Sequence, residues 1–164
     1  MKKIIFLTII TALALFAEEL QIKAKLFNAD QKKGISIFEG NVNIIKGTDE
    51  LNASKVTIYT DKEQNPTKFL AEGNASFYIV TEDGARYRGK AQKVIYFPVK
   101  KEYHFFTDVY LHQLNEKKEI IGSEVILKTI EGKAYAKGAE KAPVIMIFDI
   151  PDKEEDKNKK EEIK

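Results

Sequence analysis

Apolar and polar residues of this chain alternate with a period of two from residue 20 to residue 150, and no other pattern in the sequence limits the possible folds as strongly. Leu20, Ile22 and Ala24 alternate with polar neighbours, and the same rhythm returns repeatedly further along. A period of two is the side-chain repeat of a β-strand with one buried face. Beyond the first 17 residues, no segment sustains an apolar stripe with helical spacing. The pattern therefore predicts an all-β domain.

Turn-forming residues interrupt the alternation at intervals of 6–12 residues. Glycine, asparagine, aspartate and proline are the residues that hairpin connections prefer. Short strands at such regular spacing indicate an antiparallel sandwich, barrel or roll. The predicted turns are Asn28–Gly34, Gly47–Asp49, Asp61–Pro66, Glu82–Gly84, Pro98–Lys100, Asn115–Lys118 and Glu131–Gly132.

The chain also repeats itself. The segment FEGNVNI at 38–44 is similar to AEGNASF at 71–77 and, more loosely, to FTDVYLH at 106–112. The anchors of these segments are Gly40, Gly73 and Asp108, which lie 33 and 35 residues apart. A second segment follows each one, and its equivalent positions are Val56, Val94 and Val125. A repeat of this length predicts stacked hairpins that contact mainly their neighbours and leave two open ends.

Residues 1–17 have the organisation of a signal peptide. Two lysines form a positively charged start, an apolar stretch follows from Ile4 to Phe16, and Ala17 is a small residue suited to cleavage. The stretch is shorter than the ~20 residues that span a bilayer. We therefore expect export and cleavage after Ala17. The alternative is an uncleaved membrane anchor, because Leu15 is a poor residue two positions before the cut.

The rest of the chain divides into an expected domain at 18–150 and a charged, disordered tail at 151–164. Eleven of the thirteen residues at 152–164 are charged, so this segment cannot bury enough apolar surface to become ordered. Just before the tail, Val144–Phe148 is continuously apolar. Such a run fits a strand that is covered on both faces or by a partner.

Composition limits the classes of partner. The formal net charge is +2, and loss of Lys2 and Lys3 with the signal peptide leaves 25 basic and 25 acidic residues. This balance gives no overall attraction to nucleic acid or to an anionic membrane. The sequence has no cysteine, which in an exported protein favours a bacterial envelope over a eukaryotic secretory route.

The sequence offers little that could support catalysis. His104 and His112 are the only histidines, and their separation of eight residues matches no metal-ligand spacing. The acidic pairs at 49–50 and 82–83 fall at predicted turns, where a solvated role is expected. Phosphate-binding glycine loops and a nucleophile motif are absent from the sequence. We therefore expect no enzyme activity, no catalytic or metal-binding residues, and no cofactor.

Two asparagines stand in possible glycosylation sequences. Asn52 in ELNAS and Asn74 in EGNAS both fit N-x-[ST], and each has a glutamate two residues before it. This arrangement resembles the extended acceptor sequence of some bacterial N-glycosylation systems. Both asparagines fall inside predicted strands, where a transferase has poor access, so the sequence favours an ordinary structural role and leaves modification open.

One alternating set of side chains is strongly apolar and could form a binding surface. It is the natural core of a sandwich, and alternation by itself does not distinguish a filled core from an open lipid groove. The set consists of Leu20, Ile22, Ile35, Ile37, Val42, Ile44, Val56, Ile58, Phe77, Ile79, Val94, Tyr96, Phe105, Leu111, Val125 and Leu127.

The repeat motifs resemble those of the LptA/OstA-like family, which are periplasmic proteins of lipopolysaccharide transport. The resemblance rests on FxGNVxI…LxAxxVxIY, on its repeat AEGNASFYIV…GKAQKVIYF and on FxxDVYL…IxGxxVxL, and it covers about residues 20–130. It implies an open, slightly twisted antiparallel β-jellyroll with an apolar interior. It implies that Leu20, Ile22, Phe77 and Tyr96 face lipid. The other candidate lipid-binding residues come from the alternating apolar set, and they are Ile35, Ile37, Val42, Ile44, Val56, Ile58, Ile79, Val94, Phe105 and Leu111.

The resemblance also implies partners. It predicts a periplasmic bridge that shields the acyl chains of lipopolysaccharide and passes this lipid from the inner to the outer membrane. An LptC-like inner-membrane protein would pair with the N-terminal edge, an LptD-like outer-membrane protein with the C-terminal edge, and copies of the chain could join head to tail. Two alternatives are an LptC-like anchored subunit and a structural, self-assembling envelope protein with a closed core.

Overall fold

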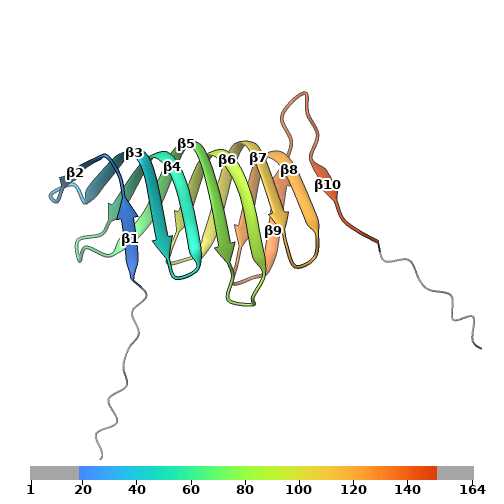
Figure 1. The fold of residues 1–164 in the computed structure, drawn as a ribbon, viewed down its shortest axis with the longest axis horizontal. Coiled ribbons are helices and arrows are strands. Elements are labelled where there is room, and N and C mark those ends of the chain that lie inside the picture. The colour runs from blue at the N-terminus through green and yellow to red at the C-terminus, as the bar shows by residue number, and fades with distance from the viewer. Residues whose placement is uncertain (1–18, 151–164) are drawn as a thin grey trace, which may run out of the picture.

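The computed structural model describes residues 19–150, which form one ten-stranded antiparallel sheet (Figure 1). The predicted signal peptide and the tail at 151–164 lie outside the described residues. The strands follow in the order β1-β3-β4-β5-β6-β7-β8-β10, with β2 also paired to β3 and β9 also paired to β8. Their bounds are β1 Leu20–Lys23, β2 Leu26–Asp30, β3 Ile35–Lys46, β4 Asp49–Thr60, β5 Pro66–Val80, β6 Arg86–Phe97, β7 Glu102–Gln113, β8 Lys118–Lys128, β9 Lys133–Lys137 and β10 Ile145–Ile147.

The sequence repeat marks the places where strands bend. β3, β5 and β7 each carry two consecutive residues with positive φ. The pairing register of β5 and β7 shifts there with both neighbours, whereas β3 shifts against β4 and on its other side passes from pairing with β2 to pairing with β1. An extra residue in one strand of a pair forms a β-bulge, which bends that strand. The left-handed backbone suits glycine and asparagine, so the motif letters encode the bend itself. The pairs are Gly40 (85°) and Asn41 (50°), Gly73 (84°) and Asn74 (50°), and Thr107 (64°) and Asp108 (53°).

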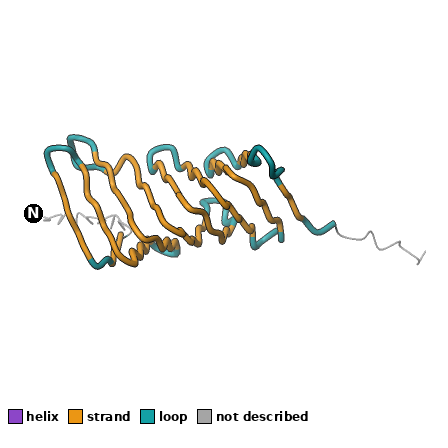
Figure 2. The backbone as a smooth tube through the Cα atoms, turned by 90° about the horizontal axis from the view of Figure 1, so that it is seen from above, coloured by secondary structure: helices purple, strands orange, loops and turns teal. Residues whose placement is uncertain are grey.

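The bends divide the sheet into two layers that face each other (Figures 1 and 2). The first layer contains β2, β9 and residues 35–39, 55–60, 66–72, 93–97, 102–106 and 124–128. The second layer contains β1, β10 and residues 42–46, 49–52, 75–80, 86–90, 109–113 and 118–122.

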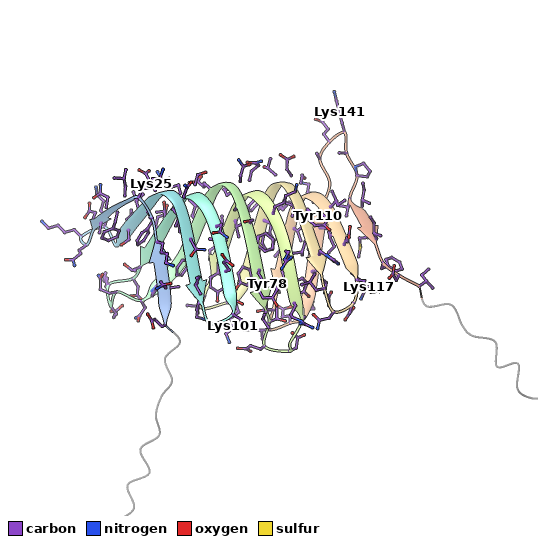
Figure 3. All side chains as sticks on the ribbon, viewed as in Figure 1. Lys25, Tyr78, Lys101, Tyr110, Lys117 and Lys141 are labelled. Atoms are coloured by element: carbon purple, nitrogen blue, oxygen red, sulfur yellow. The ribbon has the colours of Figure 1, made fainter. Side chains whose placement is uncertain are left out.

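The bent side of the sheet, here called the ridge, is closed by the strands themselves, whereas the hairpin turns lie along the opposite side, here called the mouth. Figure 3 shows Lys25 on the ridge side and Lys101, in a turn, on the mouth side. The predicted turns fall between strands or at strand ends, except that the one at Asn28–Gly34 begins too early, since Asn28, Ala29 and Asp30 belong to β2 and pair with β3. The expected open antiparallel jellyroll is confirmed. The two ends of the sheet carry β1 with β2 and β9 with β10 (Figure 1).

The N-terminal end differs from the sequence pattern. Alternation runs from Leu20 to Leu26 without a break, yet the chain forms two strands that pair with opposite halves of β3. The backbone crosses from one layer to the other at Lys25, whose N–H donates to the carbonyl oxygens of Glu39 (3.0 Å) and Gly40 (3.1 Å). The break in pairing therefore sits beside the first bend.

The C-terminal end contains the strand expected at Val144–Phe148, which forms as β10 and pairs with β8. The expectation that this strand is covered on both faces is wrong for the described chain. Ile145, Met146 and Ile147 are 47%, 56% and 49% exposed, because one edge of β10 and both of its faces lack a neighbouring element within residues 19–150. Cover by a partner stays a proposal.

The core lies between the two layers and is built from the inward side of every long strand. Val56, Phe105 and Val125 are fully buried. The side-chain nitrogen and oxygen atoms that are buried within residues 19–150 all have hydrogen-bond partners. A search of the same residues for a helix long and apolar enough to cross a membrane found none.

We predict that Gly73→Ala lowers the free energy of unfolding by about 2–4 kcal/mol, because it adds left-handed backbone strain and a steric clash. A Cβ at position 73 would lie 2.6 Å from Ser54 Oγ and 2.7 Å from Ser54 Cβ. Gly84→Ala is the matched control, since its φ is +82° but a Cβ there meets nothing within 4 Å. It should cost about 1 kcal/mol. Denaturant unfolding followed by circular dichroism measures both, and equal losses would contradict the prediction.

Candidate functional site

The inward faces of the two layers enclose a continuous apolar interior. Cross-strand partners carry it along each layer, as in the second layer, where Ile22 faces Ile44, Ile44 faces Leu51 and Leu51 faces Phe77. The first layer supplies an equivalent row that includes Val56. The interior therefore extends along the sheet and is a candidate site for an elongated apolar ligand.

Stacked aromatic rings connect the ridge side of this interior with the mouth. The Phe77 ring, from the second layer, stacks on the Phe105 ring, from the first, with centroids 4.5 Å apart. From Phe105 the series continues to Tyr103 at 6.2 Å, then to Tyr96 at 4.4 Å and to Phe69 at 6.0 Å. Of these contacts the Phe77–Phe105 stack joins the two layers, and the others lie within the first layer, where they extend the aromatic surface to the mouth.

Gly89 makes the stack between the layers possible. It is the cross-strand partner of Phe77 and Leu111 on the inward face of β6. A Cβ at this position would lie 2.6 Å from Phe77 Cζ and 2.3 Å from the carbonyl oxygen of Tyr110. The absence of a side chain here is what leaves room for the Phe77 ring.

The open space inside is small. A cavity of about 90 Å³ lies between the layers, next to the aromatic series. A cavity that holds one benzene molecule is about 150 Å³, so this space is too small for an acyl chain of about a dozen carbons. A lipid can enter only if the two layers move apart. The cavity is lined by Leu20, Ile44, Lys46, Asp49, Glu50, Leu51, Phe69, Ala71, Phe77, Tyr78, Ile79, Val94, Tyr96 and Tyr103.

Polar groups surround the mouth. Lys101, from the turn after β6, pairs with Glu82, from the turn after β5, and this exposed ion pair spans the two layers. Asp49 accepts a hydrogen bond of 2.8 Å from the backbone N–H of Val80. Burial raises the pKa of Tyr103 well above its usual value, and Tyr96 and Asp49 add to this effect, so its phenol stays neutral.

Most of the predicted lipid-binding residues lie together on the inward face. These are Leu20, Ile22, Val42, Ile44, Val56, Ile58, Phe77, Ile79, Val94, Tyr96, Phe105 and Leu111. Whether they contact lipid stays a proposal.

Ile35 and Ile37 are the exceptions, and their placement on the inward face was wrong. Phe38, between Ile37 and the bend, packs on the core and faces Val56, so its neighbour Ile37 points outward. On the outer face Ile37 lies opposite Thr57, and that row continues to Leu70. The first half of β3 is apolar on both faces, which is why apolar residues alone did not identify the inward one.

The sequence interpretation missed several inward residues, and the bends explain how they could have been found. On β3 the inward positions pass from Phe38 to Val42, four residues on, so alternation keeps its phase across the bend. On β4 they pass from Ala53 to Val56, three residues on, so the phase changes. Following the phase from Val42 back across Gly40 would have selected Phe38. The missed inward residues include Phe38, Leu51, Phe69, Tyr87, Tyr103, Val109 and Ile120.

The apolar interior is exposed at both ends of the sheet. At the N-terminal end Phe27 is 63% exposed, and its ring lies 4.8 Å from that of Phe38. At the C-terminal end Met146 lies opposite Ile120, a residue packed on the core. Apolar side chains that continue the interior are therefore accessible to solvent at both ends.

A larger hollow, of about 900 Å³, lies on the outer face of the second layer, where Figure 3 shows Tyr78 and Tyr110. It is open and shallow, and Arg88 and Lys90 contribute charge to it. It is less suited to an apolar ligand than the smaller interior, because a surface this open leaves the methylene groups of a ligand in contact with water.

The histidines do not gather polar groups into a reaction centre. His104 lies on the outer face, where its Nε2 is 3.2 Å from Glu102 Oε2. This hydrogen bond is the main cause of a lowered pKa for Glu102. Within residues 19–150 we found no group of three side chains that could hold a metal ion.

Comparison with known proteins decides the family. Residues 21–133 match the family described as LptA/(LptD N-terminal domain) LPS transport protein. The chain belongs to this family. Its members are transport proteins, in agreement with the expectation that the chain is not an enzyme. A comparison with curated protein sequences found no match.

A solved structure supports the fold of this LptA-family chain. It is the crystal structure of LptH from Pseudomonas aeruginosa, described as the LptA-homologous periplasmic component of the conserved lipopolysaccharide transport device. The TM-score is 0.71 at 17% sequence identity, and the match covers 81% of this chain and 96% of that one. At this identity the likeness establishes the jellyroll fold.

We predict that Gly89→Ala lowers the free energy of unfolding by about 1–3 kcal/mol, because an added methyl group forces the Phe77 ring away from Phe105. Near-ultraviolet circular dichroism should weaken at the same time. Lys90→Ala, next on the same strand but with an exposed side chain, should change stability by less than about 0.5 kcal/mol. An unchanged Gly89→Ala protein would show that the layers already have room to spare.

Proposed function

We propose that this LptA-family chain carries lipopolysaccharide across the periplasm by shielding its acyl chains between the two layers. The observation that supports this most directly is the apolar interior, which runs along the sheet and is exposed at both ends. Its inward lining from Ile22 to Phe105 would contact the acyl chains, whereas the sugar headgroup would stay outside the mouth.

The energetics favour such a shield. Each methylene group exposed to water costs ~0.8 kcal/mol, so one chain of a dozen carbons costs roughly 10 kcal/mol to leave bare. A continuous apolar lining offers similar contacts at successive positions, so lipid can move along it without a deep energy minimum. The sequence carries no nucleotide-binding motif, so the energy for directional movement would come from a partner.

Entry of lipid would require the mouth to widen. The layers are joined covalently at the ridge by the strands themselves, and across the mouth they are joined by side chains. The Lys101–Glu82 pair there is exposed, and pairs of this kind contribute about 0–1 kcal/mol. Opening would separate the aromatic rings of the two layers, and the acyl chains would then pack against those rings in their place. We therefore propose that the ridge is the hinge.

The periplasmic location rests on residues 1–17, with their features of a signal peptide, and on the described location of LptH. Cleavage after Ala17 would release a chain that begins at Glu18. Detection of this N-terminus would exclude the LptC-like alternative, in which the apolar stretch stays as an anchor.

The open edges are proposed as the joining surfaces. β1 and β2 would pair with an LptC-like inner-membrane protein, and β9 and β10 with an LptD-like outer-membrane protein. Edge strands pair readily with further strands, and a head-to-tail contact of this kind can also extend between copies of one chain. Met146 supports this proposal, because it would continue the inward row into the next molecule.

We predict that a photocrosslinking amino acid at Phe38 forms a lipopolysaccharide adduct in living cells, and that the same amino acid at Ile37 does not. The two positions are neighbours on β3, but Phe38 faces the interior and Ile37 faces outward. Immunoblotting for lipopolysaccharide on the purified chain measures the adduct.

The same photocrosslinking amino acid at Phe77, a second inward position, tests whether the result at Phe38 is specific to the N-terminal end of the sheet. Absence of adducts at both Phe38 and Phe77, in a chain present at normal levels, would contradict lipid carriage. It would favour the alternative of a structural envelope protein with a closed core.

We predict that the purified chain self-associates with rising concentration, and that Met146→Glu raises the dissociation constant about tenfold or more, because an unpaired carboxylate is costly to bury. Sedimentation equilibrium measures this constant. Ile130→Glu is the control, because Ile130 is 64% exposed in the turn before β9 rather than on an edge strand. Equal weakening by both variants would contradict an edge-to-edge contact.

A further inference from the structure

The two acceptor-like sequences of the chain differ in their structural setting. Asn52 in ELNAS lies on β4, and Asn74 in EGNAS lies on β5. Sequence alone treats them as equivalent, since both have a glutamate two residues before and a serine two residues after the asparagine. A glycosyl acceptor must present its amide nitrogen at an accessible surface.

Asn74 is presented at the surface by the second bend. Its φ is 50°, and it lies in the register shift between Glu72 and Ala75, outside the regular pairing with both β4 and β6. Asn74 and Ser76 are both exposed, whereas Ala75 between them is fully buried. Ser76 and Asn52 both line the open hollow on the outer face of the second layer, so the hollow does not separate the two sites. Exposure and hydrogen bonding of the two asparagines do.

Asn52 is held by hydrogen bonds. Its Nδ2 donates to Glu50 Oε1 at 3.1 Å, and its Oδ1 accepts from Asn43 Nδ2 at 2.9 Å. It is half-buried in regular pairing with Asn43 on one side and Ser76 on the other. For Asn74, no side-chain hydrogen bond occurs within the part of the chain that the structure describes. The amide nitrogen that would react is therefore engaged in Asn52 and available in Asn74.

We propose that Asn74 is an acceptor of N-linked glycosylation and that Asn52 is not. In the reaction, Asn74 Nδ2 bonds to the anomeric carbon of an oligosaccharide carried on a polyprenyl pyrophosphate. The bond from that carbon to the pyrophosphate oxygen breaks, and the amide loses one proton to the transferase or to solvent. The products are a glycosylated asparagine and the free polyprenyl pyrophosphate.

The position of Asn74 is compatible with the transport role. The inference depends on that role only in one respect, which is that the chain must be exported from the cytoplasm. Asn74 lies on the ridge, on the opposite side from the turns that border the mouth. It belongs to β5, in the middle of the strand order, away from both edge pairs. A sugar chain there would leave the mouth and the proposed joining edges uncovered.

The test uses the full chain with its own residues 1–17, expressed in a bacterium that has an oligosaccharyltransferase and its polyprenyl-linked donor. Trypsin separates the two sites, because Asn52 lies in GTDELNASK (47–55) and Asn74 in FLAEGNASFYIVTEDGAR (69–86). Mass spectrometry should find the oligosaccharide mass on the peptide 69–86 and the peptide 47–55 unmodified. Recovery of peptide 69–86 only in its unmodified form, beside a modified control glycoprotein in the same cells, would overturn the proposal.

Three variants define the acceptor. Asn74→Gln and Ser76→Ala should each abolish the modification, and both are exposed positions where the fold tolerates a change. Asn52→Gln, the matched control, should leave the modification of Asn74 unchanged. Modification of Asn52 to the same extent as Asn74 would overturn the assignment to the bend.

The first bend offers a gain of modification. Asn41 has the same φ of 50°, follows Gly40 and is exposed, but Asn43 stands where a serine is needed. Asn43→Ser completes the acceptor sequence, and the peptide 34–46 should then carry the oligosaccharide. An unmodified Asn41 in this variant, beside a modified Asn74, would show that the bend does not determine acceptance.

Failure of this proposal is separable from failure of the transport role. The peptide EELQIK (18–23), with a free N-terminus at Glu18, reports export in the same spectra. An exported chain with unmodified Asn74 overturns only the glycosylation. A glycosylated chain without lipopolysaccharide adducts at Phe38 and Phe77 overturns only the carriage of lipid.

Discussion

The left-handed backbone at three points in alternate strands is the constraint on which the rest of this molecule depends. If the sheet did not bend, its apolar face would be exposed to water, and soluble monomeric proteins rarely expose an apolar surface of that size. At Gly73 and Asn74, and at the equivalent bends in β3 and β7, the strand turns back over itself. One continuous sheet thereby covers both sides of its own core, without a disulfide or, within residues 19–150, a second sheet.

Because the strands bend, the two layers are joined more firmly at the ridge than at the mouth. At the ridge the two layers are joined by covalent chain, whereas elsewhere they are held together by side chains, among them the Phe77–Phe105 stack in the interior and the exposed ion pair between Lys101 and Glu82 at the mouth. The two ends are left as edge strands with apolar side chains such as Phe27 and Met146 exposed. An interior that can open along one side and continue at both ends is what the proposed lipid carrier needs. The bend also determines which asparagine is presented to solvent.

How far the site could be predicted is clearest at β3 and β4. Alternation placed Val42, Ile44 and Val56 correctly, because a buried face imposes a period of two on each half-strand. It failed at Ile35 and Ile37, where apolar residues also occupy the outer row and hydrophobicity no longer separates the faces. Phe38 could have been found by continuing the alternation of β3 across Gly40, because the inward positions keep their phase there. On β4 the phase changes at the bend. Which of two paired strands contains the extra residue decides this, and only the strand pairing shows it.

The long strands, most of the turns, the repeat and the family could be predicted from the sequence, because these depend on local backbone preference and on side-chain periodicity. The Gly-Asn pairs at 40–41 and 73–74 and the Thr-Asp pair at 107–108 mark the positions of the bends in the sequence, but only their positive φ angles identify them as bends. The packing of the two layers was needed to show that the interior is nearly filled, with about 90 Å³ of open space, and that Gly89 makes room for Phe77. The tertiary structure also separated Asn74 from Asn52. These outcomes depend on contacts between segments distant in the chain, and no local pattern encodes how closely two layers approach.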